Sequence, residues 1–119
     1  MKKKLELYIH IPFCIKKCKY CDFLSGPSDE ETKQAYVKQL IKEIRAQSKY
    51  YKDYQVSTIF IGGGTPSVLS GSGICDIMSA IYENFIVEAS AEISIECNPG
   101  SVDTEKLGYY KQSGINRIS

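Results

Sequence analysis

Three cysteines, Cys14, Cys18 and Cys21, lie within eight positions of the stretch "YIHIPFCIKKCKYCDF" at residues 8–23. This C-x3-C-x2-C spacing lets one loop wrap a compact inorganic cluster, because three thiolates can hold three irons of a [4Fe-4S] cube and leave the fourth iron open. An open iron can chelate a small molecule through its amino and carboxylate groups. The spacing therefore favours an iron–sulfur site.

A zinc site is the alternative reading of the same three thiols. Zinc would need a fourth ligand, for which His10 and Asp22 are the candidates. His10 belongs to an alternating strand, which would have to fold back to deliver it. The paired C-x2-C halves that are usual in zinc sites are also absent.

The other two cysteines, Cys75 and Cys97, are predicted to pack rather than to bind a metal. The chain has 119 residues, enough for one domain, and a net charge of +1, which predicts no nucleic-acid partner. No stretch approaches the ~20 apolar residues of a membrane helix, and the lysine-rich start lacks a cleavage site. We expect a cytoplasmic protein with reduced thiols.

The elements that must position the cysteines alternate between strand and helix. Ser28 and Glu31 form a capping box that opens the first helix, whose apolar residues share one face opposite a lysine-rich face. That apolar face consists of Tyr36, Leu40, Ile41 and Ile44. Strands are predicted at 5–11, 56–61 (an apolar run expected to be buried on both faces), 91–97 and 115–119, and further helices at 71–85 and 103–113. The order βαβαβαβ predicts an α/β fold with a parallel sheet.

This pattern stops within its fourth strand. An unfinished parallel sheet has an unpaired edge and uncovered apolar surface. We therefore expect residues 1–119 to be the N-terminal part of a larger barrel. A homodimer that pairs the unfinished edge is a candidate assembly.

Three motifs are predicted to meet at the carboxyl ends of the strands, where parallel α/β folds bind ligands. The cysteines follow the first strand, "GGGTP" follows the second, and "ECNPG" closes the third. Glycines allow close approach of backbone amides to a ligand, although a plain turn is as good a reading of this loop alone. Glu96 could bind a ribose hydroxyl or an ammonium group, or be a solvated strand end. Tyr8 and Tyr20 flank the cysteine loop and could shield a cluster or fill the core.

These motifs resemble the radical S-adenosylmethionine (SAM) superfamily. Within it, "LYIHIPFC", "IFIGGGTPS", "EISIECNPGSVD" and "GINRIS" are similar to the oxygen-independent coproporphyrinogen III oxidase family (HemN and HemW) along essentially the whole chain. The resemblance implies a partial (β/α)6 barrel, a [4Fe-4S] cluster and SAM, whose sulfonium bond the reduced cluster cleaves to give a 5'-deoxyadenosyl radical. It also implies haem or a porphyrinogen, and an electron donor such as flavodoxin. The positions that match SAM contacts of the family are Tyr8, Tyr20, Gly63, Gly64, Thr65 and Glu96.

Two branches of this family differ near the cysteines. In the oxidases a fourth cysteine follows the third after one residue, whereas here Asp22-Phe23 follows Cys21 and Pro66-Ser67 continues the glycine loop. Both details resemble the HemW branch, which is implied to bind and hand on haem. A genuine oxidase, a non-catalytic haem or metal carrier and a zinc-stabilised module remain the alternatives. Because family residues that complete the SAM site lie beyond Ser119, we expect this chain alone to be inactive.

Overall fold

The computed structural model describes residues 3–13, 30–98, 100 and 102–119. Its strands are β1 (Lys3–Ile11), β2 (Tyr54–Gly63), β3 (Ile86–Ile95) and β4 (Arg117–Ile118). Its helices are α1 (Glu30–Ser48), α2 (Gly71–Asn84), α3 (Thr104–Gln112) and the short 3-10 helix η1 (Pro66–Val68). The predictions for Cys14, Cys18, Tyr20, Cys21, Asp22 and Ser28 fall outside the described residues.

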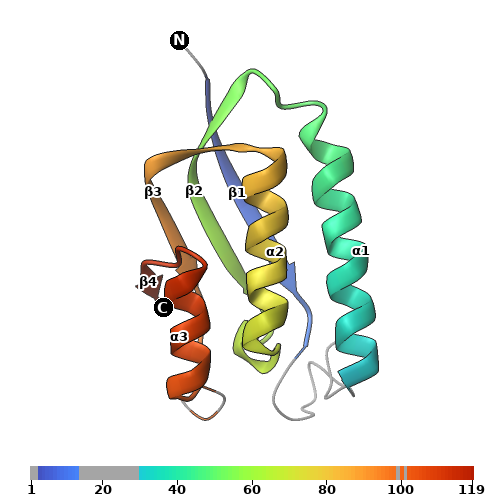
Figure 1. The fold of residues 1–119 in the computed structure, drawn as a ribbon, viewed down its shortest axis with the longest axis vertical. Coiled ribbons are helices and arrows are strands. Elements are labelled where there is room, and N and C mark those ends of the chain that lie inside the picture. The colour runs from blue at the N-terminus through green and yellow to red at the C-terminus, as the bar shows by residue number, and fades with distance from the viewer. Residues whose placement is uncertain (1–2, 14–29, 99, 101) are drawn as a thin grey trace.

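The four strands form one parallel sheet in the order β1-β2-β3-β4. Each helix connects two neighbouring strands, so the predicted βαβαβαβ α/β architecture is confirmed. The strands lie in the sheet in the same order as in the sequence. In a doubly wound sheet the strand order reverses at one point, whereas in a parallel barrel each strand lies next to the one before it, as here. Figure 1 shows α1, α2 and α3 side by side on the same face of the sheet.

The helix-covered face of the sheet carries the core. Its fully or nearly fully buried strand residues are Ile9, Ile11, Val56, Ile59, Ile61, Ile93 and Ile95. The buried residues Ile74, Ile77 and Ile81 of α2 recur every three or four positions, which keeps one stripe of that helix against the sheet.

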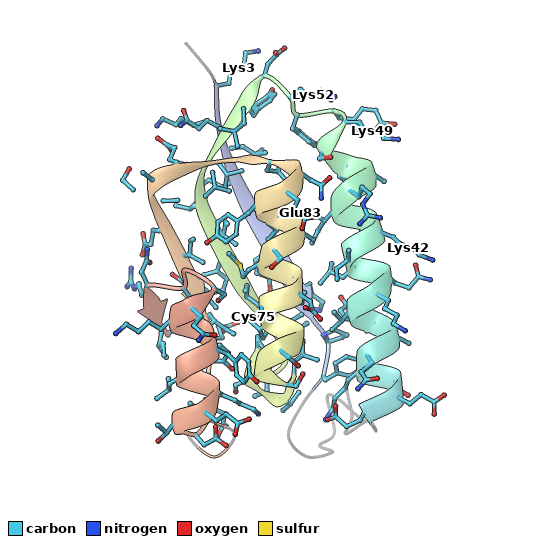
Figure 2. The ribbon with its side chains drawn as sticks, viewed as in Figure 1. Lys3, Lys42, Lys49, Lys52, Cys75 and Glu83 are labelled. Atoms are coloured by element: carbon cyan, nitrogen blue, oxygen red, sulfur yellow. The ribbon has the colours of Figure 1, made fainter. Side chains whose placement is uncertain are left out.

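The apolar face predicted for α1 is confirmed. Ile44 is buried, while Tyr36, Leu40 and Ile41 are partly buried against the core. Val37, which the prediction left out, is buried as well. Lys38 and Lys42 of the same helix are exposed, as the lysine-rich opposite face predicted, and Figure 2 labels Lys42 on the outer side of α1.

The second face of the sheet, here called the open face, is not covered by a helix among the described residues. It presents Glu6, Tyr8, His10, Phe60, Glu92 and Glu96. The prediction that residues 56–61 are buried on both faces is therefore wrong, since Phe60 is 36% exposed. The physical reason is that all three helices pack on the same side, so alternate residues of β2 face away from them.

A bulge explains why Val56 and Ile59, three residues apart, both face the helices. The pairing of β1 with β2 shifts between Leu5 and Glu6, and the pairing of β2 with β3 shifts between Val56 and Thr58. An extra residue in a strand reverses the faces of all that follow. The apolar spacing of this strand is therefore a consequence of the bulge.

All four predicted strands have other bounds in the structure. β1 begins at Lys3 rather than at residue 5, and β2 spans Tyr54–Gly63 rather than 56–61, so that Gly62 and Gly63 belong to the strand that they were predicted to stop.

β3 spans Ile86–Ile95 rather than 91–97. The prediction missed its first half because the segment "EAS" breaks the apolar alternation, although Val87 already pairs with Val56. β4 spans only Arg117–Ile118 of the five residues predicted.

Within the described part of the chain, no helix has the length and apolar character needed to cross a bilayer.

Candidate functional site

The carboxyl ends of β1, β2 and β3 meet at one rim of the sheet, as the sequence predicts. Hydrogen bonds join the residues that follow each strand there. The Gly64 amide donates to the Ile11 carbonyl at 2.8 Å, and the Glu96 amide donates to the Ile61 carbonyl at 3.0 Å. The rim therefore brings the glycine loop between the start of the cysteine loop and the end of β3.

The glycine loop is held against the chain that enters the cysteine loop. The Thr65 amide donates to the Phe13 carbonyl at 2.5 Å, one residue before Cys14, and Gly64 bonds Ile11 in the same way. Two consecutive amides of the loop thus bind the backbone of residues 11–13. The last described residue before Cys14 is therefore tied to the glycine loop.

Gly63 requires the absence of a side chain. Its φ is +119°, and a Cβ there would lie 2.5 Å from the Ile11 carbonyl oxygen and 2.9 Å from the His10 ring. At Gly62, a Cβ would lie 2.4 Å from Oε1 of Glu96. The chain's own groups therefore occupy the space that these two glycines leave, where the sequence analysis expected room for a ligand.

Glu96 lies on the open face directly over the glycine loop. Its Oε1 accepts a hydrogen bond from the Gly63 amide at 2.9 Å. A carboxylate has about four lone-pair sites, so this bond leaves capacity for further donors. Glu96 and Gly63, predicted separately as binding residues, are in direct contact.

A small cavity of about 170 Å³ opens beside this contact. Its lining joins the glycine loop to the end of β3 and consists of Gly64, Thr65, Pro66, Glu96, Cys97, Asn98 and Ser119. A larger cavity of about 240 Å³ lies between α1 and α2 and includes none of the predicted site residues. The smaller cavity is therefore the one that fits the predictions.

Tyr8 is placed on the open face and is 58% exposed. Its ring stacks on Phe60 with 5.9 Å between centroids and an interplanar angle of 13°. Its hydroxyl lies 3.4 Å from Nδ1 of His10, which in turn sits against Gly63. Tyr8 therefore reaches the rim through Phe60 and His10 rather than by contact with Glu96.

Phe60 and His10 are the site residues that sequence reasoning missed. Both alternate with core residues of their strands, so the period-2 pattern of a strand could have placed them on the face opposite the core. Phe60 was overlooked because β2 was expected to be buried on both faces. His10 was considered only as a zinc ligand.

The two described cysteines pack, as predicted. Cys75 lies on α2 (Figure 2), and its thiol donates to the Tyr109 carbonyl of α3 at 3.3 Å. Cys97 is half-buried against the core. Burial raises the pKa of both thiols, so they remain protonated near neutral pH. Among residues 3–13, 30–98, 100 and 102–119, no group of three His, Cys, Asp or Glu side chains could hold a metal ion.

A family model described as the radical SAM superfamily matches residues 8–119 of this chain. The heme chaperone HemW of Escherichia coli strain K12 is 42% identical over 97% of this chain and 31% of its own length. The HemW of Lactococcus lactis is 37% identical over 100% of this chain and 30% of its own length. The oxygen-independent coproporphyrinogen III oxidase of Salmonella typhimurium is 36% identical over 99% of this chain and 26% of its own length.

A solved structure with the same arrangement is the coproporphyrinogen III oxidase HemN from Escherichia coli, described as a radical SAM enzyme. It aligns with a TM-score of 0.87 at 33% identity, over 98% of this chain and 27% of the enzyme. The chain spans about a third or less of the length of these relatives.

Proposed function

Because the chain belongs to the radical SAM superfamily, we propose that Cys14, Cys18 and Cys21 hold a [4Fe-4S] cluster and that SAM binds at the rim of the sheet. The observation that carries this proposal is the contact of Gly63 with Glu96 at 2.9 Å, beside amides that bind the chain entering the cysteine loop. When bound, the reduced cluster supplies the electron that cleaves the sulfonium bond of SAM.

The donor set fits the group. Three thiolates are the ligands that iron–sulfur clusters take, and the described thiols Cys75 and Cys97 are engaged in packing elsewhere. The described chain leaves the rim at Phe13 and returns at Glu30, at the same end of the sheet as the glycine loop (Figure 1). A cluster on this loop would lie beside the rim where SAM is proposed to bind.

Each proposed SAM residue has a distinct task. Glu96 accepts a hydrogen bond from a ribose hydroxyl or the ammonium group, and Thr65 with the Gly64 backbone lines the cavity next to it. Tyr8, stacked on Phe60, offers an apolar ring that excludes water from the open face. Tyr20 lies against the nucleoside in this proposal, by its similarity to the family. Gly63 acts indirectly, by holding Glu96 in place.

We further propose that the chain is of the haem-chaperone type rather than an oxidase. Asp22-Phe23 replaces the segment that carries a fourth cysteine in the oxidases, and the HemW relatives reach 42% identity against 36% for the oxidase. Haem or a porphyrin is then the proposed partner and a flavodoxin-like protein the proposed electron donor, in the cytoplasm. A second copy pairing along a free sheet edge is the proposed assembly. Oxidative decarboxylation of a porphyrinogen is the alternative.

Metal analysis after anaerobic reconstitution with iron and sulfide tests the cluster. We expect about four irons and four sulfides per chain, and a large loss in C14A, C18A and C21A. C75A is the matched control and should retain the cluster, because the Cys75 thiol is engaged elsewhere, in a hydrogen bond to the Tyr109 carbonyl of α3. Bound zinc without sulfide would contradict the proposal and favour the zinc-stabilised module.

Haem titration tests the branch. A chaperone-type protein should give a stoichiometric change in the haem absorption spectrum, whereas an oxidase should release carbon dioxide from a porphyrinogen when SAM and a reductant are supplied. Neither haem binding nor decarboxylation, with the cluster intact, would contradict both branches. Because the chain covers 31% of the heme chaperone and 26% of the oxidase, both assays use the chain extended to the length of those relatives.

A further inference from the structure

The backbone that enters the cysteine loop is held from two sides. On one side, Gly64 and Thr65 donate to the carbonyls of Ile11 and Phe13. On the other side, the hydroxyl of Tyr36 donates to the carbonyl of His10. We propose that Tyr36 is a positioning residue that, through its contacts with His10 and Phe13, holds the backbone of residues 10–13, where the chain enters the cysteine loop. This inference rests on the proposed function.

The direction of the His10 carbonyl follows from that of the neighbouring Ile11 carbonyl. Successive carbonyls of a strand point to opposite edges, and the Ile11 carbonyl points toward β2, where Gly64 binds it. The His10 carbonyl therefore points to the outer edge of β1, which is the first strand in the order of the sheet. Edge carbonyls have no strand partner on that side, so Tyr36 satisfies a group that the sheet leaves open.

The ring of Tyr36 makes a second contact with the same segment. It meets the ring of Phe13 edge-on, with 5.4 Å between centroids and an interplanar angle of 82°. Phe13 is 5% exposed, although it lies outside β1 and directly precedes Cys14. Tyr36 therefore fixes both the direction of the backbone at His10 and the packing of the last described residue before the cysteines.

The contact also joins the described residues on the two sides of the cysteine segment. Tyr36 lies on α1, whose first residue, Glu30, is the first described residue after that loop. A hydrogen bond between positions 36 and 10 joins the two sides of the segment that contains all three clustered cysteines. Restricting both ends of a loop lowers the conformational entropy that it loses on binding a cluster. Burial and the neighbouring Glu43 raise the pKa of Tyr36, which keeps the hydroxyl protonated as a donor.

The experiment compares Y36F with Y82F. Y36F keeps the ring against Phe13 and removes only the hydroxyl. Y82F is the matched control, since Tyr82 also donates from a helix to a backbone carbonyl, that of Ser113, at 2.8 Å and away from the rim. Both variants lose one hydrogen bond of similar type, so their unfolding midpoints should fall by similar amounts.

Two readouts then separate positioning from general stability. In Y36F, amide hydrogen exchange at Gly64 and Thr65 should be faster by about five-fold, the factor that corresponds to one ordinary hydrogen bond. Iron loss from the reconstituted cluster to a chelator should accelerate by about the same factor. Y82F should leave both rates at the value of the unmodified chain. The exchange measurement requires no cluster, and the chelation measurement reports on the cluster directly.

The outcomes distinguish this inference from the proposed function. If the unmodified chain holds a cluster and Y36F matches Y82F in both rates, the positioning role of Tyr36 is wrong and the proposed function stands. If the unmodified chain takes up no cluster, the proposed function fails and the inference fails with it. Faster exchange and faster iron loss in Y36F alone would support both.

Discussion

The two faces of the sheet differ in kind. The helix-covered face is built from β-branched apolar residues such as Ile59, Ile61 and Ile95, each no more than 1% exposed. The open face carries aromatic, acidic and basic side chains, and a shallow cavity of about 330 Å³ lies over it. Neighbouring residues of one strand thus face two environments. The covered face holds the fold together, and the open face together with its rim is available for ligands.

The two faces also differ in how they treat charged and polar groups. The salt bridge of Glu92 with Arg117 lies on the open face, where solvent screens both charges. Tyr8 and Phe60 stack there without being sealed from solvent. On the covered face, an unpaired polar group would lose its hydration with no compensation. The contrast predicts that substitutions on the two faces will have separable effects on stability and on binding.

The largest difference in the free energy of unfolding should be between substitutions of two adjacent residues of β2, one on each face. I61A removes a fully buried side chain from the covered face and should lower the free energy of unfolding by about 3 kcal/mol, because it leaves a cavity. F60A removes a larger side chain from the open face and should cost about 1 kcal/mol, the value of the contact with Tyr8. Urea denaturation followed by circular dichroism measures both. Equal losses would show that the open face is packed as tightly as the covered one.

A substitution of Gly63 at the rim should lower the free energy of unfolding by nearly as much. G63A forces a Cβ into a residue with a φ of +119° and within 2.5 Å of the Ile11 carbonyl, which should cost about 2 kcal/mol.

G108A is the control for that substitution. Gly108 lies within α3, and nothing surrounds its missing Cβ within 4 Å, so alanine there should stabilise the chain by about 0.5 kcal/mol. Thermal unfolding compares the two variants with the parent chain. A neutral G63A would contradict the geometry of the glycine loop.

Glu96 should affect binding more than folding. E96Q retains an oxygen that can accept from Gly63 but loses the charge, so the unfolding free energy should change little. Affinity for SAM should fall about ten-fold, because a charged acceptor forms stronger hydrogen bonds than a neutral one. Calorimetric titration with SAM of the cluster-loaded chain, extended to the length of its relatives, measures this affinity. A loss of stability without a loss of affinity would make Glu96 a structural residue.

The smallest effect should come from the exposed salt bridge. E92Q removes the partner of Arg117 and should change the unfolding free energy by less than about 1 kcal/mol, since both side chains are well exposed. SAM affinity should be unchanged, which makes E92Q the control for E96Q, since Glu92 lies on β3 and Glu96 directly follows that strand on the same face. A large change in either quantity would mean that the two ends of the open face are coupled.

The fold was largely predictable from the sequence because its strands are separate apolar runs stopped by glycine or proline. The first half of β3 was not, since "EAS" lacks the alternation of a half-buried strand although Ile86 and Val87 pair with β2. The sequence also did not predict that one face of the sheet is left open. An apolar run such as residues 56–61 does not reveal which of its side chains will contact a helix. Phe60 is exposed because α1, α2 and α3, the long helices of the described residues, pack on the other side of the sheet.

The sequence proposes most members of the candidate site but not their contacts, and it does not point to Phe60. The motifs and the family resemblance propose Gly63, Glu96 and Tyr8, but no local pattern shows that Glu96 accepts from Gly63, 33 positions away. The bond of Tyr36 to His10 spans 26 positions and depends on which carbonyl lies at the sheet edge. Such pairs follow from strand register and helix placement, and these are properties of the assembled sheet.

The central claim is that the rim presents a cluster with an open iron to SAM. The most direct test is the electron paramagnetic resonance spectrum of the anaerobically reconstituted and reduced protein, with the chain extended to the length of its relatives, recorded with and without SAM. The account predicts a signal of a reduced [4Fe-4S] cluster that changes when SAM is added. A cluster signal that is indifferent to SAM, or a chain that binds zinc and forms no cluster, would contradict it.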